Sequence, residues 1–372
     1  MKILYNFRAI AVWGGIERIL VDKMNLLVEK YGMDVYLLTT DQGNNPIPYE
    51  LSENVHHEDL NICFYKQYCH HGLKRLFVLR NMFRQYELLL SDRLNSLKPD
   101  LIVCTTSDHI GSIVKVKGSI PLIVESHSIC VRTIEDGKYW LQRKIYRRKF
   151  LHALCKVDAL VALTKGDAQQ WRKFHHHVCV IPNFLHQHIE RPSAQESKSV
   201  IFVGRFDYQK RAQDAITVWS LVGKRHPDWT LDIYGEGVMV EEIRMLASSV
   251  GNVIVHNPTS RIFQAYSKSA LLMMTSLFEP FGLVLIEAMS CGLPVLAYDC
   301  PYGPDDIITD GMDGYLIKGR DAKTFADKLC QLIEREDLRC QMGQYAVSSS
   351  RKYNAEVVMP LWLQLFESTV KT

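Results

Sequence analysis

Hydrophobic and polar positions follow two patterns along the chain: short, nearly continuous apolar runs and longer runs with helical spacing. The N-terminal half begins with an apolar run at 3–7, a helical pattern at 17–31 and a second apolar run at 35–39. Further apolar runs lie at 101–104, 122–125, 159–163 and 178–181. This alternation predicts βαβ units. Because the runs lack a polar face, we expect a parallel sheet covered by helices on both faces, with ligands bound at the carboxyl ends of its strands.

The second half repeats the alternation. Strands are expected at 199–203, 230–234, 253–256 and 270–274. Helices are expected between them, at 212–226, 240–248 and 260–267. A helix at 283–291, strands at 294–298 and 315–317, and two closing helices complete the pattern, with the last helix at about 355–370. Between the two series, the polar stretch 186–198 has no apolar period, which indicates a linker. Residues 40–75 give no clear pattern.

Chain length and composition agree with two globular domains. A chain of 372 residues exceeds one ordinary domain and suggests two of roughly 150 to 200 residues each. The longest apolar runs, 270–276 and 293–298, are much shorter than the roughly 20 residues that cross a bilayer. The first residues lack the pattern of a signal peptide, so a cytoplasmic location is expected.

Residue types that bind metals are present but not grouped. The ten cysteines include no C-x-x-C pair and are expected to be reduced core thiols, and the histidines at 175–177 are expected in a solvated loop. The acids Asp305, Asp306, Asp310 and Asp313 lie in a segment rich in glycine and proline, where helix capping and turn formation are the better interpretation. We expect neither a metal nor a cofactor.

Charge is distributed unevenly between the two halves. Residues 1–184 hold 25 Lys and Arg against 18 Asp and Glu, a net +7, and the remainder holds 19 against 23, a net −4. The basic excess lies in 138–149 and 66–84, where cations alternate with aromatic and aliphatic residues and helices are expected. Such helices can lie on an anionic membrane. Alternatively, they pack their apolar side against the core and expose their basic side to solvent. The sequence leaves both open, and nucleic acid is not an expected partner.

Two strand-to-helix turns carry candidate anion-binding residues. Gly14 and Gly15 stand at the turn before the first helix. Glycine there lets a ligand come close to the backbone, and the free amides at the helix start can bind an anion such as a phosphate. A tight turn, however, needs glycine for steric reasons alone. Gly204 and Arg205 follow the first strand of the second half, and Lys210 precedes its helix. An arginine and a lysine at one strand end can hold a diphosphate, and a surface pair of cations is the alternative.

The most specific feature is the segment 276–295. Glu279 lies in its loop and Glu287 lies eight positions further on, inside a helix that opens with Phe281, Gly282 and Leu283. Free amides at the start of that helix can bind phosphate or sugar hydroxyls. Glu287 is a carboxylate among apolar neighbours and needs a partner, which a ribose diol supplies. A glycine turn at 234–237 marks another place where a ligand can pass close to the backbone.

These motifs together resemble the family 4 retaining glycosyltransferases, whose GT-B fold has two Rossmann-like domains facing each other across a cleft. The resemblance covers nearly the whole chain and rests on the glycine loop with Glu17, the Pro182-Asn183 linker, Gly204-Arg205 with Lys210, the turn at 234–237 and the paired glutamates. The family linker continues with glycine, whereas Phe184 stands here. The resemblance implies an acceptor-binding domain at 1–184, a donor domain at 185–354 and a C-terminal helix at 355–372 that packs back toward the N-terminal domain.

The resemblance also implies residue roles. Arg205 and Lys210 would bind the donor diphosphate, Glu287 the ribose and Glu279 the transferred sugar, with these two cations and Glu279 acting in catalysis. His127 matches a family histidine near the reacting centre, although satisfied core histidines are common. The remaining donor contacts implied are Gly15, Gly204, Gly235, Pro258, Thr259, Phe281, Gly282 and Leu283.

The function implied is retaining, metal-independent transfer of a hexose or N-acetylhexosamine from a nucleoside-diphosphate sugar, with a UDP-sugar favoured. The acceptor would be a glycan or lipid-linked molecule in surface polysaccharide synthesis, with the enzyme at the inner face of the membrane. Cations placed where the leaving group gains charge would replace a metal. One alternative is a UDP-sugar 2-epimerase on the same fold, which would need its own carboxylates and histidines. The other is a non-catalytic nucleotide-sugar-binding subunit, against which the retained charged residues argue.

Overall fold

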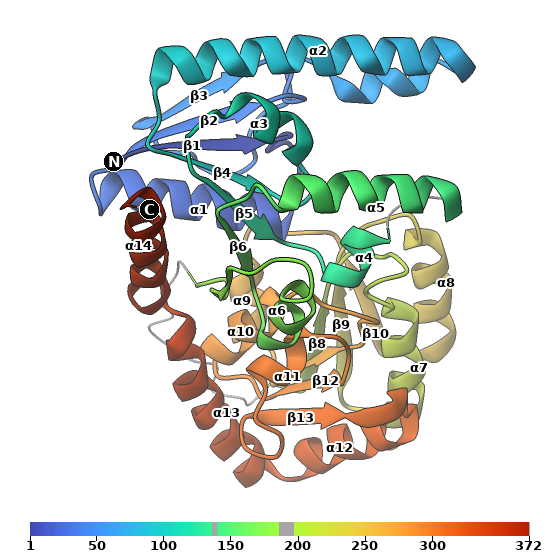
Figure 1. Ribbon diagram of the computed structural model, residues 1–372. Helices are drawn as coiled ribbons and strands as arrows, with labels where there is room; N and C mark the ends of the chain where they lie inside the picture. The colour runs from blue at the N-terminus through green and yellow to red at the C-terminus, as the bar shows by residue number, and fades with distance from the viewer. Residues whose placement is uncertain (136–139, 186–196, 372) are drawn as a thin grey trace. The chain divides into compact units, whose positions relative to one another are not determined.

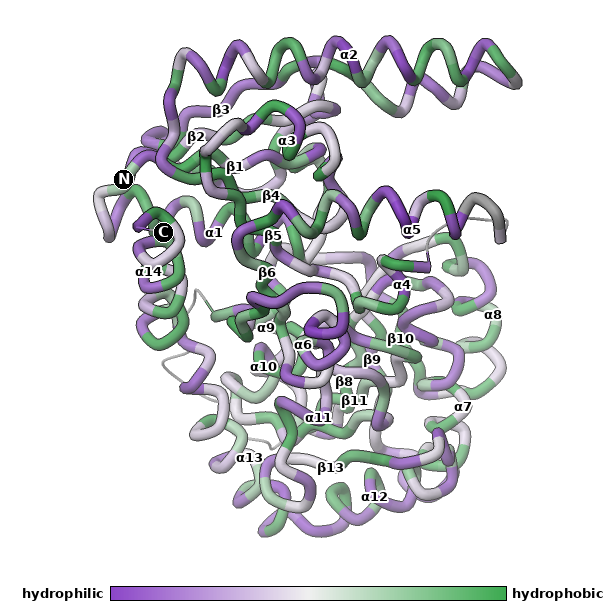
Figure 2. Tube along the Cα trace, in the orientation of Figure 1, coloured by the Kyte–Doolittle hydropathy of each residue, from purple (hydrophilic) through white to green (hydrophobic). Residues whose placement is uncertain are grey.

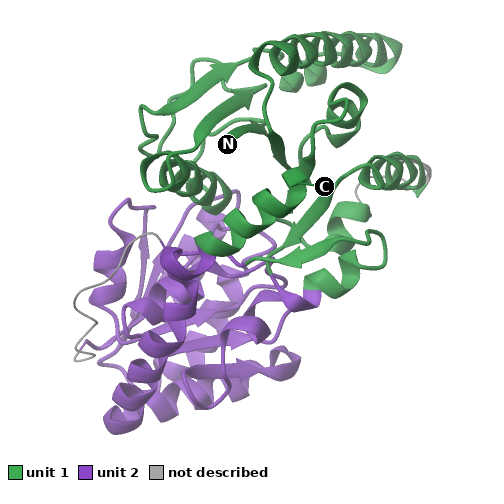
Figure 3. Ribbon diagram, turned by 60° about the vertical axis from the view of Figure 1, so that its left-hand side comes forward, with its two compact units in different colours: residues 1–163, 167–181, 359–372 green, residues 164–166, 182–358 purple. Residues whose placement is uncertain are grey.

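The computed structural model describes residues 1–135, 140–185 and 197–371 (Figure 1). Most of the expected linker at 186–198 therefore lies outside the described residues. The chain forms two compact units (Figure 3). Unit 1 consists of Met1–Leu163, Asp167–Ile181 and Met359–Thr372, and unit 2 consists of Thr164–Gly166 and Pro182–Val358.

Unit 1 is built on a parallel sheet with strand order β3-β2-β1-β4-β5-β6-β7. Its strands are β1 Lys2–Phe7, β2 Asp34–Thr39, β3 Val55–Asp59, β4 Leu101–Thr105, β5 Leu122–Ser126, β6 Ala159–Ala162 and β7 Val178–Val180. Every residue of β4, β5 and β6 is buried, as expected for strands covered on both faces. The chain order reverses between β1 and β4, so the carboxyl ends of these two strands mark the position where ligands bind in such sheets.

Helices cover the sheet of unit 1 (Figure 1). They are α1 Gly15–Glu29, α2 Gly72–Leu97, α3 Ile110–Val116, α4 Cys130–Ile134, α5 Trp140–Leu154, the part of α6 Lys165–Trp171 from Asp167 onward and the part of α14 Ala355–Lys371 from Met359 onward. On α1, Leu20, Met24 and Leu27 are buried at helical spacing, which places one apolar stripe against the sheet. On α14, Trp362 and Phe366 are buried in the same way.

The basic stretch 66–84 is not one helix. A 3₁₀ turn spans Phe64–Cys69, the backbone is extended at His70, and α2 begins at Gly72, which has a φ of +56°. Glycine in this left-handed region interrupts a helix at low steric cost. Figure 2 shows hydrophilic and hydrophobic residues alternating along α2 and α5.

Unit 2 has a second parallel sheet, with order β10-β9-β8-β11-β12-β13. Its strands are β8 Ser199–Val203, β9 Thr230–Tyr234, β10 Val253–His256, β11 Leu271–Met274, β12 Val295–Tyr298 and β13 Gly314–Ile317. Its helices are α7 Ala212–Val222, α8 Val240–Val250, α9 Ile262–Ser267, α10 Leu283–Ser290, α11 Gly303–Ile307, α12 Ala322–Glu334 and α13 Glu336–Ser350. Here the chain order reverses between β8 and β11. The expectation of two Rossmann-like domains is confirmed.

Three helices, rather than the expected two, follow β13. The first of them, α12, is capped by the Asp321 carboxylate, which accepts a hydrogen bond from the backbone N–H of Lys323 at 3.0 Å. The break between α12 and α13 falls at Arg335, whose φ of −115° and ψ of 87° are not helical. Neither glycine nor proline marks this break, so the sequence carries no stop signal there.

Two further expectations are wrong in part. His175 is buried, and its ring nitrogens each lie 3.0 Å from a backbone carbonyl oxygen, those of His177 and Val157. It is therefore a core histidine and not part of a solvated loop. Cys69 and Cys155 are exposed, so the cysteines are not all core thiols. No helix in the described part of the chain is both long and apolar enough to cross a membrane.

Candidate functional site

The candidate site in unit 2 is formed by the loops that follow β8 and β11. These strands are neighbours in the sheet and end at Val203 and Met274. Because the strands are parallel, the loop at 204–210 and the loop at 275–279 lie at the same edge. That edge is the point where the chain order reverses, which is where ligands bind in open α/β sheets.

Hydrogen bonds hold the two loops together. The Asp207 carboxylate accepts hydrogen bonds from the backbone N–H groups of Gln209 at 3.0 Å and Lys210 at 2.9 Å, which forms a turn. The Gln209 side-chain amide donates to the carbonyl of Phe278 at 3.1 Å, and the N–H of Leu277 donates to the Gln209 carbonyl at 2.8 Å. The position of Lys210 is thereby fixed relative to the second loop.

A buried ion pair forms the centre of the site. The Lys210 Nζ lies 2.7 Å from Glu279 Oε1, and the Ser276 hydroxyl donates to the same oxygen at 2.6 Å. The Glu279 side chain is 3% exposed and that of Lys210 is 17% exposed. A carboxylate at this depth is stable only with a cation and hydrogen bonds, and both are present. The structure thus brings together Lys210 and Glu279, which are 69 residues apart in sequence.

Arg205 lies at the end of β8 in a different environment. Its side chain is 68% exposed, and its Nη2 lies 3.2 Å from Asp207 Oδ2 and 3.4 Å from Gln209 Oε1. An exposed pair of this kind contributes little to stability. Arg205 is therefore an accessible cation next to the buried pair, as a residue that contacts an incoming anion would be.

Glu287 lies on α10 and is buried. The Tyr266 hydroxyl donates to Glu287 Oε2 at 3.0 Å, and Tyr266 itself is fully buried. The helix begins at Leu283, directly after Gly282, whose φ is +107°. Phe281 is buried and packs edge to face against Tyr353, with ring centroids 5.5 Å apart. The Phe281 side chain is thus a core residue, and a ligand contact there would use its backbone.

The glycine turn after β9 has a structural cause. A Cβ at Gly235 would lie 2.0 Å from the carbonyl oxygen of Gly204 and 2.8 Å from the ring of Phe206. The backbone N–H of Gly204 donates to the carbonyl of Tyr234 at 3.0 Å, which brings the two turns this close. Glycine at 235 is required by this packing whether or not a ligand binds.

The remaining residues expected in unit 2 lie in exposed or turn-forming positions. Pro258 and Thr259 are exposed in the loop after β10, where the Thr259 hydroxyl accepts a hydrogen bond from the N–H of Arg261 at 3.1 Å. The Asp313 carboxylate accepts from the N–H of Thr309 at 2.8 Å, and that of Asp310 accepts from the N–H of Leu316 at 2.9 Å. These two acids form turns, as the sequence indicated.

Two supporting residues of this site were missed by sequence reasoning. Arg320 donates from Nη1 to the carbonyl of Ser276 at 2.8 Å and from Nη2 to that of Thr275 at 2.9 Å, which holds the start of the Glu279 loop. Gly303 lies where a Cβ would be 1.7 Å from the carbonyl oxygen of Phe281, and its N–H donates to the Glu279 carbonyl at 3.1 Å. Neither residue lies in a local sequence motif from which these long-range contacts could be predicted.

Unit 1 contributes a separate group of expected residues. Gly15 is the first residue of α1, so its backbone lies at a helix N-terminus. His127 follows β5 and is 8% exposed, with Nε2 3.0 Å from Glu125 Oε2. Glu125 is buried and pairs with Lys23, whose Nζ lies 2.6 Å from the same oxygen. The sequence did not predict that Glu125 and Lys23 accompany His127.

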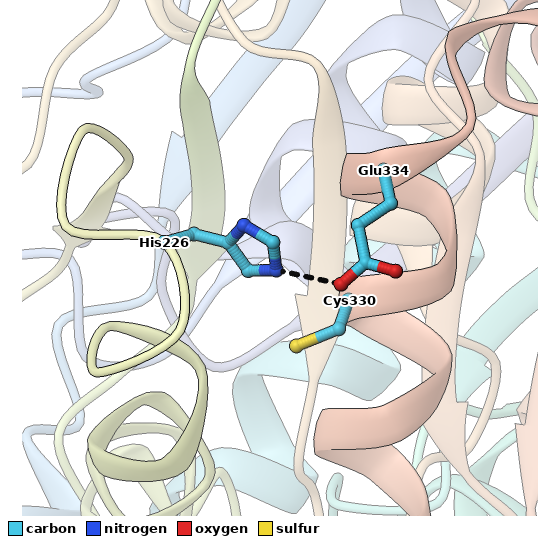
Figure 4. A group of neighbouring side chains, drawn as sticks. All are labelled: His226, Cys330 and Glu334. Atoms are coloured by element: carbon cyan, nitrogen blue, oxygen red, sulfur yellow. Dashed lines mark hydrogen bonds and ion pairs between the residues drawn. The ribbon is translucent and has the colours of Figure 1, made fainter.

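A second group of potential ligand atoms lies in unit 2, between α7 and α12 (Figure 4). His226 Nε2 is 3.1 Å from Glu334 Oε1, and Cys330 lies one turn before Glu334 on the same helix. The Arg225 guanidinium is 3.5 Å from Glu334 and 2.8 Å from Asp327, so this carboxylate already has a cation. Burial raises the pKa of Cys330 to about 11, which keeps the thiol protonated. The group is an ion-pair network that joins α12 to the loop after α7.

The comparisons with known proteins agree with this architecture. The sequence profile of "Glycosyltransferase Family 4" matches residues 13–187, and that of "Glycosyl transferases group 1" matches residues 185–348. A crystal structure of a Staphylococcus aureus TarM mutant in complex with fondaparinux, α-GlcNAc-glycerol and UDP aligns with a TM-score of 0.76 at 18% identity, over 98% of this chain and 99% of that one. The two sheets and the matched profiles define a glycosyltransferase of the GT-B class. The chain belongs to the group 1 transferases of glycosyltransferase family 4.

Two curated relatives differ in how much of their length the chain covers. The amylovoran biosynthesis glycosyltransferase AmsD of Erwinia amylovora is 26% identical over 376 residues, which is 97% of this chain and 98% of AmsD. The exopolysaccharide phosphotransferase SCO2592 of Streptomyces coelicolor is 30% identical over 223 residues, which is 58% of this chain but only 24% of that protein. The chain therefore matches AmsD along its length and SCO2592 over about a quarter.

Proposed function

We propose that this glycosyltransferase moves a hexose or N-acetylhexosamine from a UDP-sugar, with retention of configuration, to a glycan or lipid-linked acceptor in surface polysaccharide synthesis. The observation that carries the proposal is the buried Glu279 carboxylate, held by Lys210 and Ser276 at the strand ends where ligands bind in this fold. The role of AmsD in amylovoran synthesis supports the acceptor class, and the UDP in the TarM crystal structure supports the nucleotide.

Apart from Gly15 in unit 1, the proposed donor contacts all lie on elements of unit 2. Glu287, oriented by the Tyr266 hydroxyl, would accept hydrogen bonds from the ribose diol, because an ionised carboxylate is an acceptor of several hydrogen bonds. The free amides at the start of α10, at Gly282 and Leu283, would face the sugar or phosphate. Glu279 would accept hydrogen bonds from hydroxyls of the transferred sugar.

Lys210 and Arg205 would stabilise the leaving diphosphate. The Lys210 ammonium has three donors, so its bond to Glu279 leaves it able to contact a phosphate oxygen at the same time. Arg205, with its exposed guanidinium, would donate two parallel hydrogen bonds to two further phosphate oxygens. Each positioned cation can supply a few kcal/mol as charge develops on the leaving group, which is the basis for proposing a metal-independent reaction.

Unit 1 would bind the acceptor and would supply His127 to the reaction, and the backbone of Gly15 would contact the donor phosphate. Exposed apolar residues are frequent on α2, on the 3₁₀ turn before it and on α5: Tyr65, Tyr68, Leu73, Leu76, Phe77, Trp140 and Ile145. Basic residues lie among them, and α3 contacts both α2 and α5. An apolar face with cations beside it is suited to an anionic bilayer, so we place the enzyme at the inner membrane face, where a lipid-linked acceptor lies.

Donor turnover by the purified chain tests the proposal. UDP-, GDP- and ADP-sugars are screened with a lipid extract as acceptor, and release of the nucleotide is measured for wild type, Lys210→Ala and Glu279→Ala. We expect one donor to be consumed and both variants to lose at least about a hundredfold in rate, because each removes charge stabilisation at the reacting centre. Lys268→Ala and Glu241→Ala, which remove exposed residues of the same types elsewhere in unit 2, should keep wild-type rates.

Other outcomes separate the competing functions. Binding of a nucleotide sugar without turnover by the wild type would favour the non-catalytic subunit. Conversion of the donor into its 2-epimer in the absence of acceptor would favour the epimerase. Wild-type rates in both Ala variants would contradict the site.

A further inference from the structure

A buried network links His127 to the C-terminal helix within unit 1. Lys23 on α1 and Glu125 on β5 each have side chains only 1% exposed, and the Lys23 Nζ lies 2.6 Å from Glu125 Oε2. The same carboxylate oxygen lies 3.0 Å from His127 Nε2. A lysine, a glutamate and a histidine thus share one oxygen atom in the interior of the unit.

The charge on Glu125 determines which ring nitrogen of His127 carries the proton. Burial raises the pKa of Glu125, but the Lys23 ammonium and the hydrogen bond with His127 outweigh it, so the pKa of this carboxyl is below its usual range. An ionised carboxylate only accepts hydrogen bonds. His127 must therefore donate from Nε2, and in the neutral ring Nδ1 then carries the lone pair.

Trp362 completes the network from the other side of Lys23. The Lys23 Nζ lies 3.6 Å from the centroid of the Trp362 ring, and Trp362 is 2% exposed on α14. A cation over the face of a buried tryptophan is stabilised electrostatically, and this contact helps to keep the ammonium charged away from water. Because the chain from Met359 onward belongs to unit 1, these contacts all lie within one compact unit.

We infer that Lys23, Glu125 and Trp362 are positioning residues for His127, and that through this network they hold the imidazole tautomer that carries its proton on Nε2 and offers Nδ1 to the substrate. The inference rests on the role proposed for His127 in the reaction. Stability alone is a weak reason for the arrangement, since well-packed apolar residues generally stabilise a core as well as a buried ion pair does. The end of the chain would thereby be part of the acceptor-side site.

Nitrogen NMR of the full chain, labelled with ¹⁵N-histidine, tests the inference directly. Side-chain ¹⁵N shifts distinguish a protonated from an unprotonated ring nitrogen, and His127→Gln identifies the signals of His127. The wild type should show a protonated Nε2. Glutamine at 125 would keep an acceptor oxygen beside Lys23, so the test uses the double variant Lys23→Met with Glu125→Leu, which removes the acceptor and leaves no buried charge unpaired. Nε2 then has no acceptor, and a measurable share of the form protonated on Nδ1 should appear. The kcat of the double variant should fall at least about tenfold while the donor KM stays within about threefold, since a tautomer affects the chemical step.

Two further comparisons separate positioning from packing. Trp362→Phe retains an aromatic face for Lys23 and should keep the wild-type tautomer and rate, whereas Trp362→Leu loses the cation–π contact and should lower kcat at least about threefold. Glu87→Gln removes a carboxylate that pairs with Lys115 outside the network and should change neither readout.

The outcomes are distinct for the inference and for the proposed function. A wild-type His127 protonated on Nδ1 overturns the inference without the need for any variant. A double variant, Lys23→Met with Glu125→Leu, whose His127 keeps the wild-type tautomer alone also overturns it. A His127→Gln enzyme that turns over at the wild-type rate would instead contradict the role of His127 in the reaction.

Discussion

Asp108 couples the stability of unit 1 to pH. It lies just after β4 and is 8% exposed, and its carboxylate accepts hydrogen bonds from the N–H of Thr105 at 2.6 Å and from the Thr105 hydroxyl at 2.9 Å. Burial raises the pKa of Asp108 to about 7, and the two bonds from Thr105 oppose that shift only in part. The folded state therefore favours the protonated carboxyl.

The sign of the pH dependence follows from this shift. Below the unfolded pKa of about 4 both states are protonated, and the contribution of Asp108 is fully present; it is lost as the pH rises from about 4 through about 7. We predict that the contribution of Asp108 to the pH slope of the wild type, measured by calorimetric unfolding, is a loss of stability on the order of a few kcal/mol across that range. Asp108→Asn should flatten this slope, and the exposed Asp92→Asn should not. Equal slopes in wild type and Asp108→Asn would contradict the assignment.

Residues of the site were predictable where they lie in a local motif. Lys210, Glu279 and Glu287 follow strand ends or a helix start, so their chemistry and spacing are visible in the sequence. Their partners were not predictable, because Ser276 and Tyr266 act through hydrogen bonds that depend on the folded loops. The Lys23–Glu125 pair joins residues 102 positions apart, for which no local pattern exists.

At the level of elements, buried parallel strands were predictable to within about two residues because each is a short apolar run between polar loops. Helix α2 was predicted only in part, since a helix was expected at 66–84 and the structure has it at Gly72–Leu97. Leu73, Leu76 and Phe77 are exposed on it, so its apolar residues do not form a single stripe that faces the core. Exposed apolar residues on one helix are typical of a surface that contacts another molecule, which agrees with the membrane contact proposed for α2.

A charge-reversal variant of α5 tests membrane contact. Arg143, Lys144, Arg147 and Arg148 are exposed on this helix. Each cation near an anionic surface contributes about 1 kcal/mol, so their reversal to Glu should weaken binding to phosphatidylglycerol vesicles by about 4 kcal/mol or more, which is roughly a thousandfold. Cosedimentation with these vesicles measures the effect, with neutral phosphatidylcholine vesicles for comparison.

The matched control reverses four exposed cations of unit 2: Lys224, Arg244, Lys268 and Lys323. This control should bind vesicles like the wild type. Equal binding by the α5 variant and the wild type would contradict a membrane role for this helix.

At the scale of the whole molecule, the chain consists of two units of one architecture with different contents. Unit 2 contains the Lys210–Glu279 pair, Glu287 and the loops that fix them. Unit 1 contains the His127 network and the exposed basic and apolar helices. This distribution supports donor binding by unit 2 and acceptor binding by unit 1.

The most direct test of the account is calorimetric titration of wild type, Glu287→Gln and Glu279→Gln with UDP and with the UDP-sugar found by the turnover screen. We propose that Glu287 contacts the nucleotide and that Glu279 contacts the sugar. Glu287→Gln should therefore weaken the binding of both UDP and the UDP-sugar at least about tenfold, as expected for a lost charge-assisted hydrogen bond. Glu279→Gln should weaken the UDP-sugar and leave the affinity for UDP at the wild-type level or above. Wild-type affinities in both variants, or loss of UDP binding in Glu279→Gln alone, would contradict the account.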